Sequence, residues 1–245
     1  MTLNTYRFYR NKFSSKYGEL VICNDSKNYW RKDIFPYYKH SRKEKIKDSD
    51  LDWSSIFNSM TKIREEVKEI FPYKNITVDR TEADDIISVI CKHNRNEKIL
   101  IISSDKDFQQ LQRYENVDQY SPIRKDFLSC NNPEEFLTDH IIKGDSSDGI
   151  PNILSDDDVF LMEDKRQKPC GKKKMGIIKE NLSEWTGTDK WKRNQSLIDL
   201  NSLPKQYESA ILTEYEKEPV GKRSNILNYF IKNKLKNLMS NIEEF

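Results

Sequence analysis

The sequence predicts an α/β fold, with a mostly parallel sheet, helices on both of its faces, and a helical C-terminal subdomain. Strand-like and helix-like segments alternate along residues 1–148, which is typical of this class. The segment KILIISS at residues 98–104 has a continuously apolar centre, as expected for a strand buried on both faces. Beyond residue 149 strand patterns fade, and short helical patterns with charged linkers replace them. We therefore expect a core over 1–148 and a helical domain over 149–245.

The chain enters on a predicted helix and reaches its first strand only afterwards. Aromatic residues recur at helical spacing over residues 3–17, and Gly18 offers a C-cap before the short apolar strand at 19–23. A second helix is predicted over residues 50–71, where apolar residues recur with helical periodicity.

Four further strand signals, the last two of them in a hairpin, and three further helix signals follow. In chain order we expect a strand at 76–79, a helix capped by Thr81, a strand at 98–104, a helix at 107–114, a hairpin from VDQYS (117–121) to DFLS (126–129), and a helix at 133–143 ended by Gly144.

The composition excludes several classes of protein. The longest apolar runs are four residues, as in Ile99–Ile102, which excludes a membrane span and an ordinary secretory signal. The four cysteines lie far apart without a CxxC pair, which argues against a zinc site or a disulfide framework. We expect a cytoplasmic location. The net charge of +2 comes from 42 basic and 40 acidic residues, so the distribution of charge is more informative than its sum.

Acidic residues cluster where predicted strands and helices end. Each group alone has an ordinary explanation, as a helix-dipole partner, a turn residue or a solvated loop. Together they would repel one another unless a cation compensates. Oxygen ligands without Cys or His favour Mg²⁺, with Mn²⁺ as a substitute, and their number favours two ions. The candidate metal ligands are Asp25, Glu82, Asp84, Asp85, Asp105, Asp107, Asp145 and Asp148.

Histidines and nucleotide-binding motifs do not compete for this role. His40 lies in a basic segment, whereas His93 and His140 lie on predicted helices, and none is paired with an obvious Ser or Cys nucleophile. The sequence contains neither GxxxxGK[ST] nor GxGxxG, so phosphate cradling by a glycine-rich loop is unsupported.

Two basic segments flank the acidic groups. Residues 29–47 hold seven Lys or Arg against two acids, interleaved with aromatic residues, and residues 165–179 hold seven basic residues and no acid. Cations neutralise phosphates and aromatic rings stack on unpaired bases, although a charge run can simply be a solvated surface. The candidate nucleic-acid-binding residues are Tyr29, Arg31, Lys32, Tyr38, Lys39, Arg42, Lys43, Lys172, Lys173 and Lys174.

Three acidic motifs resemble those of the 5′-nuclease, or flap endonuclease, family. They are TEADD (81–85), SSDKDFQQL (103–111) and KGDSSDGIPN (143–152). The stretch from NYWRKDIFPYYKHSRK to LDW (28–53) is similar to the branch of this family found in T-even bacteriophages. The resemblance implies a PIN-like core, a basic arch at 29–50, and a helix–turn–helix-like element at 149–182 that grips duplex DNA.

The resemblance also implies an activity. Such an enzyme hydrolyses RNA–DNA hybrids during primer removal, and 5′ DNA ends or flaps, with two Mg²⁺ ions. Lys39, Asp105 and Asp107 would be the catalytic residues. Branched or 5′-flap DNA and the phage single-stranded-DNA-binding protein would be partners of a monomeric protein.

One departure from the family concerns the N-terminus. Family members begin with an apolar strand that ends in a metal-binding Asp, whereas MTLNTYRFYRNKF matches the helix after that unit. We expect a start codon further upstream, with a split gene or an inactive remnant as the alternatives. The corresponding alternative function is a catalytically impaired DNA-binding accessory protein of replication.

Overall fold

The computed structural model describes residues 1–162 and 164–245, apart from the side chains of residues 43–45 and 47. Its N-terminal half contains α1 (Thr2–Tyr17), β1 (Val21–Cys23), α2 (Arg31–Ile34), α3 (His40–Lys47), α4 (Trp53–Ile70), β2 (Lys74–Ile76), α5 (Ala83–His93), β3 (Ile99–Ile102), the 3₁₀ helix η1 (Lys106–Arg113), β4 (Val117–Ser121), β5 (Asp126–Leu128) and α6 (Pro133–Lys143). The C-terminal part contains α7 (Lys172–Glu180), α8 (Leu182–Thr186), α9 (Asp189–Ile198), η2 (Leu200–Ser202), α10 (Lys205–Glu216), α11 (Arg223–Lys232), α12 (Lys236–Met239) and η3 (Ile242–Glu244).

The predicted α/β class and the helical C-terminal part are confirmed, but the strands form two small sheets. β1 pairs in parallel with β2, with Val21 opposite Lys74. In the second sheet β3 runs parallel to β4, and β4 runs antiparallel to β5. The predicted hairpin is therefore present as β4 and β5.

Helix α1 joins the two sheets. Its Leu3 and Tyr6 pack against an apolar cluster that surrounds Phe71. Further along the helix, the ring of Phe13 lies 5.0 Å from that of Tyr120 in β4. Lys12 donates a hydrogen bond to the Tyr120 hydroxyl over 2.7 Å. One helix thus holds together strands that share no backbone hydrogen bond with each other in the described part of the chain.

The apolar core consists of several clusters around the sheets. One lies between β2, α5 and α10 and includes Ile86 and Ile211, which are both fully buried. A second lies between α6 and α9 and includes Ile142. A third joins α4 to α11 and the C-terminal Phe245. Burial of each large side chain contributes about 1.5–3 kcal/mol.

Several element boundaries differ from the predictions. β2 lies at 74–76, about two residues before the predicted strand. The chain turns immediately afterwards, because Thr81 donates both its amide and its hydroxyl to the Val78 carbonyl. The predicted helix at 107–114 is a 3₁₀ helix. The described residues between 149 and 171 form no helix, so within the described part of the predicted 149–182 element α7 is the only complete helix, and α8 begins at its last residue.

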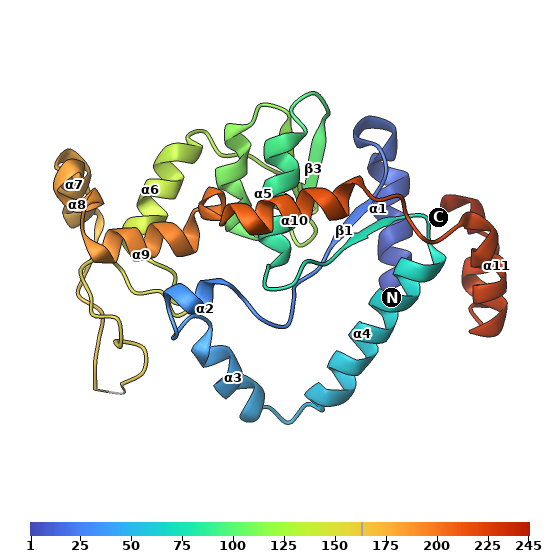
Figure 1. The fold of residues 1–245 in the computed structure, drawn as a ribbon, viewed down its shortest axis with the longest axis horizontal. Coiled ribbons are helices and arrows are strands. Elements are labelled where there is room, and N and C mark those ends of the chain that lie inside the picture. Colours follow the sequence, from blue (N-terminus) through green and yellow to red (C-terminus); the bar gives the residue numbers. More distant parts are fainter. Residues whose placement is uncertain (163) are drawn as a thin grey trace.

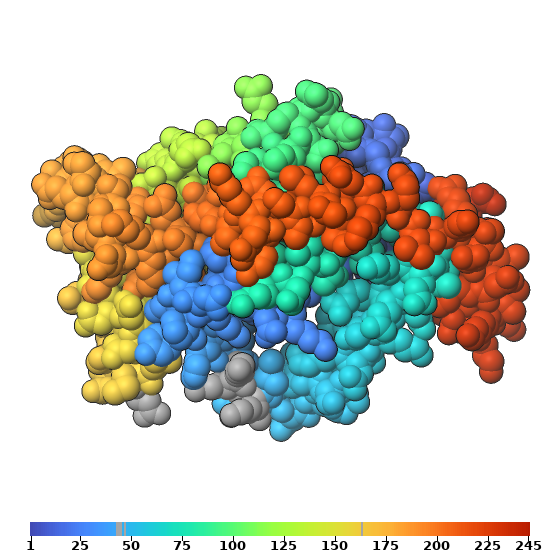
Figure 2. Space-filling model, viewed as in Figure 1, coloured from blue at the N-terminus to red at the C-terminus, as the bar shows by residue number. Residues whose placement is uncertain are grey.

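The elements are arranged so that the basic segment projects from the body. Figure 1 shows α3 and α4 extending below the sheets as the two sides of a V. Helix α10 crosses the front of the molecule, with α7 and α8 at one end and α11 at the other, as Figure 2 also shows. Within the described residues, no helix is long and apolar enough to cross a membrane.

Candidate metal centre

Carboxylates from four separate segments come together at the carboxyl ends of the parallel strands. A cavity of about 20 Å³ lies among them, which is room for about one water-sized species. The acidic residues that line it are Glu82, Asp84, Asp107, Asp145 and Asp148. Asp25 lies close by, because its carboxylate accepts the Ala83 amide at 2.8 Å.

The first turn of α5 contains two acids with different surroundings, because Asp84 lines the cavity and Asp85 does not. Glu82 is the N-cap, and its backbone N–H donates to Asp85 over 2.9 Å in a capping box. The fully buried Asp85 also accepts from Trp30 at 3.1 Å and from Arg31 at 2.7 Å. Because Asp85 does not line the cavity and both of its oxygens accept hydrogen bonds from buried groups, this position does not fit the predicted role as a metal ligand. Asp85 instead anchors the helix that presents Asp84.

Two residues that the sequence assigns to nucleic-acid binding are buried beside these acids. Arg31 is 2 % exposed and bonds to Glu82, Asp85 and the Leu197 carbonyl. Tyr38 is 4 % exposed and donates its hydroxyl to Glu82 over 3.0 Å. Burial raises the pKa of Tyr38, so it stays a neutral donor. Neither side chain is accessible, so the predicted contact with nucleic acid does not fit these two residues. They instead form hydrogen bonds that hold the acidic side chains in place.

Lys39 and Arg42 place positive charge on the same cluster. The Lys39 ammonium pairs with Glu82 and lies 3.7 Å from Asp148, and Arg42 lies 2.5 Å from Asp148. Burial alone would lower the pKa of Lys39. The negative charges of Glu82 and Asp148 raise it by a larger amount, so the net shift is upward. Lys39 has a left-handed backbone (φ 57°), and its N–H donates to the Asp148 carbonyl at 2.8 Å. This backbone geometry turns the lysine inward.

Asp84 has a strongly raised pKa, chiefly because it is buried. Burial raises its pKa to about 7; Lys39 opposes that shift, and the charges of Asp105, Glu82 and Asp25 add to it. A carboxyl group in this state favours a proton or a metal ion over free ionisation at neutral pH.

The segment after β3 supplies two more carboxylates through a tight turn. Asp105 accepts the Asp107 amide at 2.9 Å, and Ser103 accepts the Asp105 amide at 3.1 Å. Asp105 is exposed, whereas Asp107 is half-buried. Burial raises the pKa of Asp107 to about 6; His140 opposes the shift, and Asp105 and Asp145 add to it.

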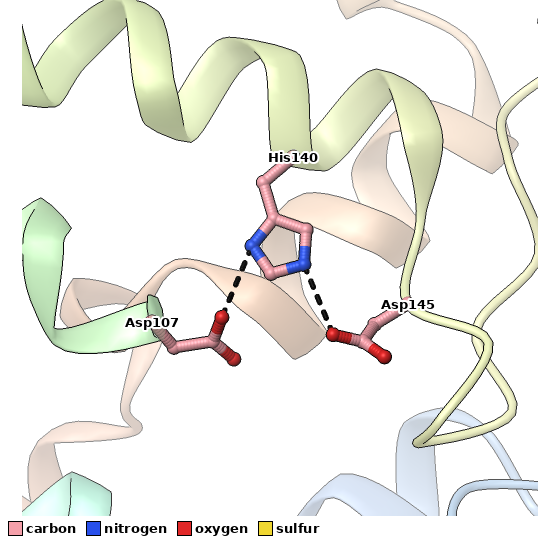
Figure 3. A group of neighbouring side chains, drawn as sticks. All are labelled: Asp107, His140 and Asp145. Carbon is pink, nitrogen blue, oxygen red and sulfur yellow. Dashed lines mark hydrogen bonds and ion pairs between the residues drawn. The ribbon is translucent and has the colours of Figure 1, made fainter. Parts of the chain in front are cut away.

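Asp145 follows α6 and faces a histidine that the sequence did not assign to the site. Figure 3 shows the His140 ring between Asp107 and Asp145. Asp145 accepts both groups of Ser147 on one oxygen, and His140 Nε2 (3.2 Å) and Lys106 (3.1 Å) approach the other. Burial alone would raise the pKa of Asp145. These hydrogen bonds lower it by a larger amount, so Asp145 stays ionised. The sequence contains one indication that His140 belongs to the site, because it lies in the last turn of the helix that ends just before Asp145.

The remaining candidate nucleic-acid contacts lie at two places. The Lys32 and Lys39 ammonium groups lie 5.2 and 5.4 Å from the centre of the Tyr29 ring. Lys172, Lys173 and Lys174 are all exposed in the first turn of α7. The Lys43 side chain lies outside the described residues.

The donor set fits divalent cations. The buried Oδ1 of Asp107 has no hydrogen-bond partner in the described structure, and it points toward His140 Nδ1, which also has none. Carboxylates with raised pKa values and an unpartnered buried oxygen are what a hard cation would satisfy. Residues that could hold an ion directly are Asp25, Glu82, Asp84, Asp105, Asp107, Asp145 and Asp148.

Comparisons with known proteins identify relatives along the whole chain. Residues 3–140 match the family described as 5′-3′ exonuclease, N-terminal resolvase-like domain, and residues 132–245 match T4 RNase H, C terminal. The ribonuclease H of Enterobacteria phage T4 is 33% identical over 260 residues, covering 100% of this chain and 85% of that protein. A 5′-3′ exonuclease of Buchnera aphidicola subsp. Schizaphis graminum is 29% identical over 161 residues, covering 62% and 53%.

Solved structures share the fold. A bacteriophage T5 flap endonuclease, in a pseudo-enzyme–product complex with DNA and metal ions, matches with a TM-score of 0.60 at 18% identity, covering 95% of this chain and 89% of that one. A T5 5′-exonuclease with bound zinc matches with a TM-score of 0.58 at 20% identity, covering 95% and 90%.

Proposed function

Because the chain belongs to the 5′-3′ exonuclease family, with a C-terminal domain of the T4 ribonuclease H type, we propose that it is a Mg²⁺-dependent nuclease of phage DNA replication. Its substrates would be RNA–DNA hybrids, from which it removes primers, and DNA with free 5′ ends or flaps. The T4 relative is named a ribonuclease H, and a T5 structural neighbour is named a flap endonuclease.

One observation carries this proposal: carboxylates from three segments line one small cavity, and Asp25 from a fourth segment lies beside it. The charges of Asp25 and Asp105 raise the pKa of Asp84, and those of Asp105 and Asp145 raise the pKa of Asp107. The four segments therefore share one electrostatic environment. Two bound Mg²⁺ ions would supply Lewis-acid stabilisation of the attacking and leaving oxygens of a phosphodiester. Mn²⁺ would substitute, because it accepts the same ligands.

The chain's own residues would position the substrate and stabilise charge. Lys39 lies at the edge of the carboxylate cluster with its pKa raised, so it can donate a charged hydrogen bond to a phosphate oxygen on which negative charge develops. Asp105 and Asp107 would hold the ions just beyond the carboxyl end of β3. Tyr29 is half-buried beside two lysines, an arrangement suited to stacking on an unpaired base.

The exposed lysines at the start of α7 would bind duplex backbone away from the site. Three ammonium groups within one helical turn, at a helix N-terminus, favour a polyanion. We also propose that the protein acts as a monomer in the host cytoplasm, and that the phage single-stranded-DNA-binding protein is a partner.

Cleavage of 5′-labelled RNA–DNA hybrid and 5′-flap DNA by the purified 245-residue chain tests the proposal. We expect short products with Mg²⁺, no products with EDTA, and at least a hundredfold loss of rate in Asp105→Asn. Asp189→Asn, which removes an exposed acid in the first turn of α9, is the matched control and should cleave normally. Cleavage without a divalent ion would contradict the mechanism, and salt-sensitive binding without any cleavage would instead support a non-catalytic accessory protein.

A further inference from the structure

His140 is a buried side chain without a full set of hydrogen bonds. It is 6 % exposed and lies in the last turn of α6. Its Nε2 contacts Asp145 at 3.2 Å, whereas its Nδ1 has no hydrogen-bond partner in the described structure. The carboxylate oxygen Oδ1 of Asp107 lies 3.3 Å from Nδ1 and also lacks a hydrogen-bond partner in the described structure (Figure 3).

The Asp145 contact determines which ring nitrogen has a free lone pair. With the ring hydrogen on Nε2, where the Asp145 carboxylate can accept it, Nδ1 is the nitrogen whose lone pair is free for a cation. A carboxylate that fixes the tautomer and orientation of a histidine in this way is a recurrent partner of metal-ligating histidines. Ser147 and Lys106 hold Asp145 in turn, so the support is itself fixed.

The spacing of the two unpartnered atoms suits a shared ion. Adjacent ligands of an octahedral divalent ion, at about 2.1 Å from the ion, lie about 3 Å from each other. Nδ1 of His140 and Oδ1 of Asp107 lie 3.3 Å apart without hydrogen-bond geometry.

We infer that His140 is a metal ligand through Nδ1, together with Asp107, and that this gives one site a preference for a transition ion such as Mn²⁺ over Mg²⁺. The inference rests on the proposed metal-dependent function and adds a ligand and a selectivity to it. Imidazole suits first-row transition ions, whereas all-oxygen sites suit Mg²⁺. The other carboxylates, including Asp84 and Asp105, form the oxygen-only part of the centre.

Pulsed EPR of the full chain titrated with Mn²⁺ alone tests this inference directly. We expect ¹⁴N coupling from a directly bound imidazole in the wild type. The coupling should vanish in His140→Gln, with Mn²⁺ affinity lower by about 10–100-fold and Mg²⁺ affinity changed much less. His93→Gln, at the exposed end of α5 beside Glu208, is the matched control and should keep the coupling.

The outcomes separate this inference from the proposed function. Mn²⁺ bound at two equivalents without ¹⁴N coupling would overturn the histidine ligand and leave the nuclease proposal standing. A wild-type chain that binds no divalent ion at all would overturn both. Asp145→Asn provides a second variant in case His140→Gln does not fold. It should retain the coupling while lowering Mn²⁺ affinity by about 10–100-fold, and an unchanged affinity would contradict the supporting role of Asp145.

Discussion

Arg31 is the cation on which the position of two buried acids depends. Its guanidinium lies 2.8 Å from Glu82 and 2.7 Å from Asp85, and all three side chains are nearly inaccessible to water. Without it, Asp85 would be buried with no compensating charge and Glu82 would keep only Lys39, which is far more costly than the loss of a surface ion pair.

We therefore expect Arg31→Met to lower the free energy of unfolding by about 3–5 kcal/mol, measured by urea denaturation. Arg80→Met is the matched control, because Arg80 pairs with Asp33 on the surface and its removal should change stability little. Equal losses in the two variants would show that burial of Arg31 does not determine its contribution.

The raised pKa values of Asp84 and Asp107, about 7 and about 6, predict a pH dependence that differs with and without metal. Without metal, the folded chain holds protons that the unfolded chain releases near pH 4, so stability falls as pH rises from about 4 to 7. Metal binding displaces these protons, so Mg²⁺ affinity should rise by up to about tenfold per pH unit for each proton released.

Thermal unfolding with EDTA or with Mg²⁺ across about pH 4–8 measures both effects. The stabilisation by Mg²⁺ should grow with pH and level off above the pKa of Asp84, at about 7. Asp84→Asn should flatten the part of the EDTA curve between about pH 4 and 7. A stabilisation by Mg²⁺ that is independent of pH would refute the assignment of these two carboxyls to the metal centre.

At the scale of elements, the turn after α6 depends on one glycine. Gly144 has φ 68°, and a Cβ there would meet the Ile150 carbonyl oxygen at 2.4 Å and Pro151 backbone atoms at 2.5 Å. The close approach matches the antiparallel bridge between Asp145 and Ile150, which closes the acidic loop. A side chain at this position has to displace the segment that carries Asp145.

Gly144→Ala should therefore destabilise the protein by well over about 1 kcal/mol and weaken Mg²⁺ binding, measured by urea denaturation and calorimetric titration. Gly176→Ala is the matched control. Nothing lies within 4 Å of its added Cβ in helix α7, so stability should rise by about 0.5–1 kcal/mol. A tolerated Gly144→Ala would mean that the loop adapts without cost.

Elements with their own periodicity and caps could be predicted from the sequence, and those that depend on distant contacts could not. Helices α4 and α6 begin after Asp52 and Asn132, whose side chains accept backbone amides as N-caps. The shift of β2 follows from the turn that Thr81 makes with Val78, a local contact that apolar patterning does not show.

The candidate site divides in the same way. The acidic residues could be found because they follow strand and helix ends, where ligands gather in α/β sheets. The burial of Arg31 and Tyr38 could not, because basic and aromatic residues in one segment give no sign of which side faces inward. His140 was missed because its pairing with Asp107 depends on how α6 packs against η1.

At the scale of the whole molecule, the basic surface of α7 lies at the opposite end from α11 (Figure 1). We expect the triple substitution of Lys172, Lys173 and Lys174 by Ala to weaken duplex binding. The slope of log affinity against log salt should become less negative by about 0.9 for each phosphate that the variant no longer neutralises, as measured by fluorescence anisotropy.

The matched control removes the same charge from the far end. Lys232, Lys234 and Lys236 are exposed at the end of α11 and the start of α12, and their triple substitution by Ala should leave the salt slope unchanged. Equal effects of the two triple variants would mean that net charge, rather than the position of the lysines, governs binding.

The cations that occupy the acidic cluster make metal and polyanion cooperative ligands. Lys39, Arg42 and Lys106 each pair with a carboxylate that a divalent ion would also engage. An ion that takes over Glu82, Asp148 or Asp145 releases such a side chain for a phosphate. By reciprocity, a nucleic acid that draws these side chains away must tighten metal binding by the same factor. Assembly of the reactive complex would therefore favour binding of both ligands over either alone, so the metal centre would fill mainly when substrate is present.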